Sequence, residues 1–171
     1  MNKGQTEIYI VSPHQFFKEH QQQLLPDWNI SVVSIVLWLQ QSRLSLKEFN
    51  LKVTKEKNRL RANFIRLGCD TIFALIDRGY RSDLFDPRDG YPLLSGRGKL
   101  TFDDNAAVNT LLHYPVLDYK NCSLIEHPTW GNNVYPATIV TVATPKVIES
   151  IIAQNLLLLK EKSNIKDLFH K

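Results

Sequence analysis

The chain has 171 residues, of which 43% are hydrophobic and 22% charged, enough for the core of one globular domain and unlike the composition of a disordered protein. Its formal charge of +4 comes from 21 basic and 17 acidic residues, an excess too small to indicate a nucleic-acid partner by itself. No apolar run reaches the roughly 18 residues of a membrane span, and no leader sequence precedes the first predicted strand. We therefore expect a cytoplasmic protein with no membrane partner.

The first half of the chain alternates segments of strand and helix periodicity. The run ISVVSIVLWL is apolar on both faces, as in a central strand that is covered from both sides. The predicted elements are a strand at 7–12, a helix at 14–25, the central strand at 30–39 and a long helix at 54–78 that ends at Gly79.

Turn residues organise the middle of the chain. The sequence DPRDG at 86–90 predicts a tight turn with a positive φ at its glycine. We expect a strand at 81–85 to enter this turn and residues 91–94 to pair back as a hairpin. After a loop at 95–104, Asp104 is expected to cap a short helix that runs to about residue 112.

The last third predicts two strands and a helix. The strands are expected at 122–127 and 134–143, joined by a loop at 128–133. Pro136 indicates that the second strand begins at an edge or a bulge, since proline cannot donate to a sheet. Thr144 as N-cap and Pro145 as first helical residue predict a helix to about residue 160.

These elements predict an α+β fold with a single mixed-sheet domain and helices packed on it. The domain is expected to span residues 6–160, with a frayed C-terminal tail at 161–171. No linker or internal repeat divides the chain.

Sequence motifs for catalysis are missing: there is no nucleophile elbow, HExxH, Walker loop or strand-linked GxGxxG. The segment GRGK at 96–99 precedes LTF rather than a helix start, so a plain loop explains it better than a phosphate site. The cations at 52–61 lack interleaved aromatic residues and predict a solvated helix face. We expect a protein that is not an enzyme.

The two cysteines have different surroundings. Cys69 falls on the apolar stripe of the long predicted helix and is expected to act as a small core residue. Cys122 has polar neighbours, and nearby Lys120 would favour a thiolate, although a plain surface or half-buried cysteine fits the same residues. Cys122 and His127 would project from opposite faces of one strand, so they are not expected to share a metal.

The loop HPTWGNN at 127–133 contains a large aromatic residue, a glycine and two asparagines. An exposed Trp130 would be an anchor for a partner protein. Alternatively, Trp130 folds back over the sheet as a lid on the core, and the sequence leaves both interpretations open.

Two segments resemble one known family. The segment LDYKNCSLIEHPTWGNNVYPATIVTVATP at 117–145 and the segment GYRSDLFDPRDG at 79–90 are similar in residue order and spacing to the family of the methylmalonic aciduria and homocystinuria type D protein. Weaker similarity covers nearly all of residues 6–155. Where the family has two adjacent cysteines, this chain has Asn121-Cys122.

The resemblance implies a fold like that of flavin-dependent nitroreductases, without flavin. It further implies an adaptor that pairs with a type C cobalamin-processing protein and directs cobalamin toward methionine synthase or methylmalonyl-CoA mutase. The resemblance also implies that this chain contacts cobalamin only in the complex with its partner, where Cys122 is the candidate cobalt ligand. The residues expected to contact the partner are Asp118, Asn121, His127, Trp130 and Gly131.

Two other functions remain as alternatives. A flavin-dependent oxidoreductase is implied by the same fold, but residues 1–15 offer only Lys3 as a cation for the flavin phosphate. A nucleic-acid-binding module depends on net charge alone and is the least favoured.

Overall fold

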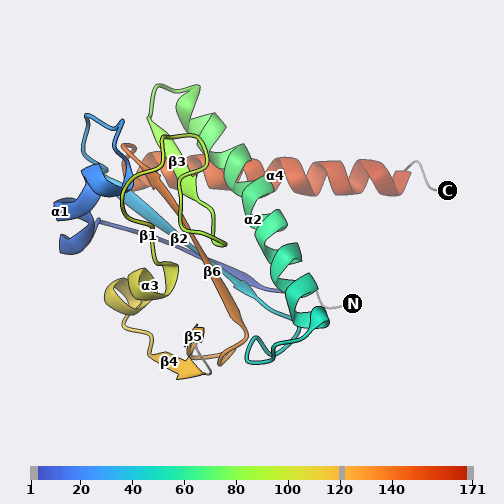
Figure 1. Cartoon of the computed structure of the whole chain (residues 1–171). Coiled ribbons are helices and arrows are strands. Elements are labelled where there is room, and N and C mark those ends of the chain that lie inside the picture. The colour runs from blue at the N-terminus through green and yellow to red at the C-terminus, as the bar shows by residue number, and fades with distance from the viewer. Residues whose placement is uncertain (1–3, 120–121, 169–171) are drawn as a thin grey trace.

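The computed structural model describes residues 4–119 and 122–168. It has four helices and six strands in this part of the chain, coloured in chain order in Figure 1. In chain order they are β1 (Thr6–Val11), α1 (Gln15–Leu24), β2 (Ser34–Gln41), α2 (Leu51–Ile76), β3 (Ser82–Phe85), α3 (Asp104–Leu112), β4 (Val116–Tyr119), β5 (Cys122–Ile125), β6 (Val134–Thr141) and α4 (Pro145–Leu168).

Four of the strands form one sheet in the order β1-β2-β6-β3, and every pairing in it is antiparallel. The α+β class is confirmed, but the expected mixed sheet is not. Strands β2 and β3 run in the same direction, and β6 lies between them, so these two parallel strands never share hydrogen bonds. The predicted central strand is confirmed as β2, although it begins at Ser34 rather than at residue 30.

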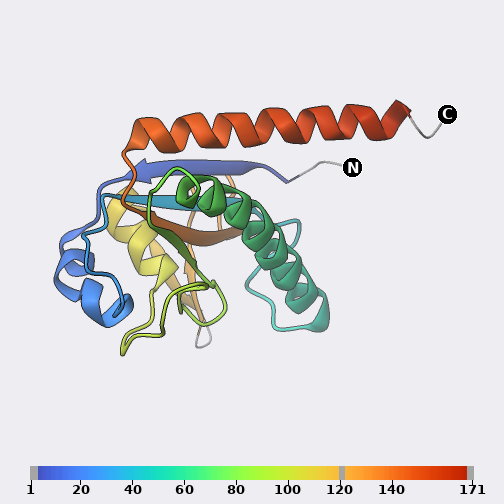
Figure 2. The ribbon, with the colours of Figure 1, turned by 90° about the horizontal axis from the view of Figure 1, so that it is seen from above.

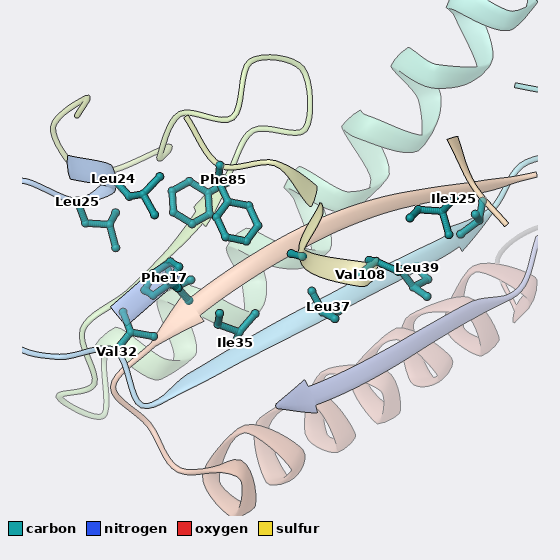
Figure 3. Packing of buried hydrophobic residues seen from close by; sticks show 14 of the residues in the cluster. Phe17, Leu24, Leu25, Val32, Ile35, Leu37, Leu39, Phe85, Val108 and Ile125 are labelled. Carbon is teal, nitrogen blue, oxygen red and sulfur yellow. The ribbon is translucent and has the colours of Figure 1, made fainter. Parts of the chain in front are cut away.

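The alternation of side chains along β2 divides the core into two layers. Ile35, Leu37 and Leu39 face α1 and α3, and Figure 3 shows them projecting toward the side of Phe17 and Val108. Val36 and Trp38 face the opposite side, where α2 and α4 pack. A strand that is apolar on both faces needs a helical layer on each side of the sheet, and this fold provides both. The end of α4 extends beyond the sheet (Figure 2).

The turn at 86–90 forms as expected, with Gly90 at φ +72°. The predicted hairpin after it is reduced to a single bridge between Phe85 and Pro92. The ladder stops there because the backbone N–H groups of Leu94 and Ser95 donate to the buried Asp83 carboxylate instead of to a strand. A side-chain acceptor thus replaces strand pairing in this segment.

Two details around α3 differ from the expectation. The cap of α3 is Asp103, whose side chain accepts the Ala106 N–H at 3.0 Å, whereas Asp104 is the first helical residue. Below α3 in Figure 1, the unpredicted strand β4 pairs with β5 in a separate two-stranded sheet. Strand β4 has only four residues and three of them are exposed, so the sequence contains no alternating pattern that would have predicted it.

The C-terminal elements begin where the sequence predicts, but their ends differ. Pro136 lies in the first half of β6, where β2 is the only hydrogen-bonded neighbour among the described strands, because β3 pairs only with Thr138 to Thr141. Helix α4 begins at Pro145, and the Thr144 carbonyl accepts the N–H groups of Val147 and Ile148. The helix continues to Leu168, beyond the expected end near residue 160.

Candidate functional site

A cleft of about 610 Å³ opens beside the first half of β6, at the point where β3 ends. Because no further strand of the described chain pairs with β6 there, the space is bordered by elements from both layers of the fold. Its walls come from the N-terminal half of α2, the turn at 87–90, the start of α3, strand β5 and the first residues of β6. The cleft therefore collects side chains that are far apart in the sequence.

Cys122 is in one wall of this cleft. The residue is half-buried, its thiol donates to the Ser123 carbonyl oxygen at 3.7 Å, and its side chain packs beside Leu46 and Val53. Both positions that the sequence analysis placed beside it, Lys120 and Asn121, lie outside the described residues. A thiol at a cleft wall can reach a ligand without a rearrangement of the core.

Cys69 has the structural role expected of it. It packs from α2 against the core layer under α4, and burial raises the pKa of its thiol. A thiol with a raised pKa is mostly protonated near neutral pH and reacts slowly. Of the two cysteines, Cys122 is therefore the candidate for chemistry.

Asp104 lines the cleft and was not predicted as a site residue. Its Oδ1 accepts a hydrogen bond from the Thr138 hydroxyl at 2.6 Å. Burial raises the pKa of the Asp104 carboxyl to about 7, and the nearby carboxylates Asp103 and Asp86 add to the rise. From sequence it was an ordinary helix-capping residue, because its neighbour Thr138 is 34 positions away.

Two further groups define the electrostatics of the cleft. The Arg61 guanidinium pairs with both oxygens of Asp86, at 2.6 Å for the Nε–Oδ1 contact, and this hydrogen bonding lowers the pKa of Asp86. Burial raises the pKa of the Tyr135 phenol, and the negative charge of Asp104 raises it further. Tyr135 therefore remains a neutral hydrogen-bond donor under all physiological conditions.

The raised pKa of Asp104 predicts a pH-dependent effect on stability. Below pH 3.8 the carboxyl is protonated in both the folded and the unfolded state. Above pH 3.8, the carboxyl ionises in the unfolded chain before it ionises in the folded protein. Ionisation therefore increasingly favours unfolding until the pH passes the folded-state pKa of about 7.

Asp104→Asn keeps an acceptor for Thr138 but cannot ionise. We expect it to raise the free energy of unfolding by about 2 kcal/mol at pH 8, after screening of a half-buried group, and by almost nothing at pH 4. Urea unfolding across this pH range measures the difference, and a gain independent of pH would contradict the assignment.

The loop that carries Trp130 is a closed turn in which His127 and Trp130 are buried. His127 and Gly131 exchange two backbone hydrogen bonds, at 2.8 and 2.9 Å, and Gly131 has φ +54°. Trp130 is only 6% exposed, stacks on the His127 ring at 4.1 Å and donates its indole N–H to Gln5. Of the two interpretations of Trp130, the structure supports the second, because the side chain folds back and covers the core.

His127 connects this loop to β1. Its Nδ1 accepts the backbone N–H groups of Thr129 and Trp130, at 3.2 Å each, so Nε2 carries the hydrogen and donates to Glu7 at 3.2 Å. Glu7 also accepts the Tyr9 hydroxyl at 2.5 Å, which is the main reason why the pKa of Glu7 is lowered. These hydrogen bonds of His127 connect the loop to β1, the edge strand of the sheet.

Asp118 is apart from both the cleft and this loop. It is exposed on β4, opposite Ser123, and does not line the cleft. The structure thus places Cys122 in the cleft and Asp118 on an exposed strand. His127, Trp130 and Gly131 lie together in one closed loop, with the first two buried.

Comparison with known proteins identifies the family. The family model of the methylmalonic aciduria and homocystinuria type D protein matches residues 1–155. The chain belongs to this family. The protein called cobalamin trafficking protein CblD is 22% identical in chicken and 24% identical in human over 142 residues, which are 83% of this chain and 48% of each relative. The rat protein of the same name is 24% identical over 141 residues. The chain spans about half the length of these relatives.

The two segments that carry the resemblance to the type D family meet at the cleft. Pro87 and Gly90 come from the first segment, and Cys122, Tyr135 and Pro136 come from the second. Within the described part of the chain, no three His, Cys, Asp or Glu side chains form a group that could hold a metal ion. None of the helices described is long and apolar enough to cross a membrane.

Proposed function

We propose that this chain is a cobalamin-trafficking adaptor without catalytic activity of its own, which presents the Cys122 thiolate to the cobalt of cobalamin held by a type C-like carrier protein. The cobalamin is cargo, and the chain would help to direct it to the enzymes that use it. The names of the relatives support cobalamin as the ligand. The cleft supports the location of the contact, because residues of both family segments line it together with Cys122.

The chemistry of the thiol supports this role. A thiolate is a soft ligand and suits a soft or borderline metal such as cobalt. The thiol must lose its proton to bind, so binding is favoured as the pH rises. Cys122 is the one sulfur-bearing side chain among the described residues that line the cleft.

The size of the cleft supports a shared site. A volume of about 610 Å³ suits a drug-sized molecule or one side of a larger one. Cobalamin, with its corrin ring, peripheral side chains and nucleotide loop, is larger than such a molecule. A carrier that holds most of the corrinoid while this chain contacts one side is consistent with that size.

The test is a change in the corrin absorption spectrum. Purified chain is mixed with a carrier protein loaded with hydroxocobalamin, and the visible spectrum is recorded. We expect a spectral change that Cys122→Ser abolishes and Cys69→Ser preserves, because only the first thiol lines the cleft. The cobalt role is wrong if the mixture leaves the spectrum unchanged or if the change survives in Cys122→Ser.

Two finer expectations belong to the same proposal. We place the protein in the cytoplasm, where unpaired cysteines such as Cys69 and Cys122 remain reduced.

We also propose that the α+β fold is related to that of nitroreductases but binds no flavin. Purified protein that is yellow and carries stoichiometric flavin would contradict this proposal and favour the oxidoreductase alternative.

A further inference from the structure

Two polar groups in the cleft have unused hydrogen-bonding capacity. Asp104 uses one carboxyl oxygen for Thr138, and its other oxygen has no hydrogen-bond partner among the described residues. The Tyr135 hydroxyl also has no hydrogen-bond partner in the described part of the chain. One free acceptor and one free donor therefore line the same cleft, and the charge of Asp104 is close enough to act on Tyr135.

The two groups lie on segments near Cys122, since Tyr135 and Cys122 pack against the same buried cluster and the start of α3 contacts β5. Asn105, the residue after Asp104, donates its side-chain N–H to the carbonyl and the hydroxyl of Ser123, at 2.9 and 3.0 Å. Ser123 is the residue after Cys122, so the start of α3 is joined to the strand that carries the thiol. Asp104 and Cys122 therefore lie on two joined segments that line the same cleft.

The charges that line the cleft are balanced. Three cationic side chains and three carboxyls line it: Lys57, Arg61, Arg88, Asp89, Asp103 and Asp104. The balance gives neither an anion nor a cation a net attraction. At Asp104 itself, burial and two neighbouring carboxylates already oppose negative charge, so a ligand carboxylate there would be repelled.

We propose that Asp104 and Tyr135 bind a primary carboxamide on the rim of the corrin ring. The Tyr135 hydroxyl donates to the amide oxygen, and the amide N–H donates to the free oxygen of Asp104. The proposal rests on the function proposed above, because the corrin of cobalamin carries several primary carboxamides at its edge. Asp104 would then favour a fully amidated corrinoid over one with a carboxylate at the same position, because the negative charge of Asp104 would repel that carboxylate.

The experiment compares hydroxocobalamin with its monocarboxylate derivatives, in which one propionamide has been hydrolysed. Each is loaded on the same carrier protein, and the chain is titrated in at pH 8 while the Cys122-dependent spectral change is followed. The measured quantity is the ratio of half-saturating chain concentrations for carboxylate and amide. Comparing variants on the same loaded carrier cancels any preference of the carrier itself.

We expect a ratio of about ten for at least one monocarboxylate isomer with the wild-type chain, the effect of one lost hydrogen bond plus one repulsive contact. Asp104→Asn should bring that ratio close to one. Tyr135→Phe should weaken binding of the amide form. The matched controls Asp70→Asn and Tyr80→Phe lie outside the cleft and should leave the ratio unchanged. Thermal unfolding shows whether each variant is folded.

The outcomes separate this inference from the proposed function. A Cys122-dependent change whose ratio is the same in the wild type, Asp104→Asn and Tyr135→Phe overturns the carboxamide site and leaves the cobalt role intact. The lack of any Cys122-dependent change with the wild-type chain overturns both.

Discussion

Replacement of Asp83 by alanine is expected to lower the free energy of unfolding by about 3 kcal/mol. The Asp83 side chain is fully buried, and its two oxygens accept backbone N–H groups from Leu84, Leu93, Leu94 and Ser95 at 2.7–3.2 Å. Among the described residues the N–H groups of Leu94 and Ser95 have no other partner. Removal of the acceptor leaves these two partly buried N–H groups without a protein partner, at up to about 1–3 kcal/mol for each.

The Asp83 prediction is checked by urea unfolding followed by far-UV circular dichroism. Asp89→Ala in the neighbouring turn is the matched control: it removes an exposed carboxylate that accepts the Tyr91 N–H and pairs with Arg97 at 3.7 Å. Its expected cost is below about 1 kcal/mol, as for other exposed pairs. Equal losses for the two variants would show that Asp83 does not organise this segment.

Gly90→Ala is expected to cost about 3 kcal/mol. Gly90 has φ +72°, and a Cβ atom there would lie 2.4 Å from the Phe102 carbonyl oxygen and 2.9 Å from the Phe102 nitrogen. The two backbones approach closely because the Phe102 N–H donates to the Gly90 carbonyl at 2.8 Å. The substitution therefore combines left-handed backbone strain with a clash against a second main chain.

Gly79→Ala separates the two causes in the Gly90 prediction. Gly79 also has a positive φ, +85°, but a Cβ atom added there would meet no other atom within 4 Å. Only backbone strain of about 1 kcal/mol should result. Because Gly90 and Phe102 both line the cleft, Gly90→Ala should also weaken the Cys122-dependent spectral change, whereas Gly79→Ala should not. Equal stability losses would mean that the contact with Phe102 is not tight.

Much of the fold was predictable because the signals were local. The doubly apolar run of β2, the stripe of α2 and the Thr-Pro start of α4 each express their structure within a few consecutive residues. The turn at 86–90 was likewise predicted from its own residues. In such segments, side-chain periodicity and backbone preference act over one or two turns of chain, whatever the rest of the molecule does.

The site was only partly predictable, because it depends on contacts between distant residues. Cys122 could be selected from its polar neighbours and from the family resemblance. Asp104 could not, since its pKa is raised by burial beneath elements remote in sequence. Trp130 was undecided between surface and core until its contacts with His127 and Gln5 were known.

By itself, the sequence determined most of the element types, the α+β class and the family, since these follow from residue order, but it did not predict β4. Only the tertiary structure decided that β6 lies between β2 and β3, so that the sheet is antiparallel rather than mixed. The end of β3 before the turn at 86–90 was predicted, but only the tertiary structure decided that this end lies beside Thr138 of β6. The cleft opens there because β6 continues beyond its pairing with β3, and the register of these two strands depends on contacts between segments that are remote in sequence.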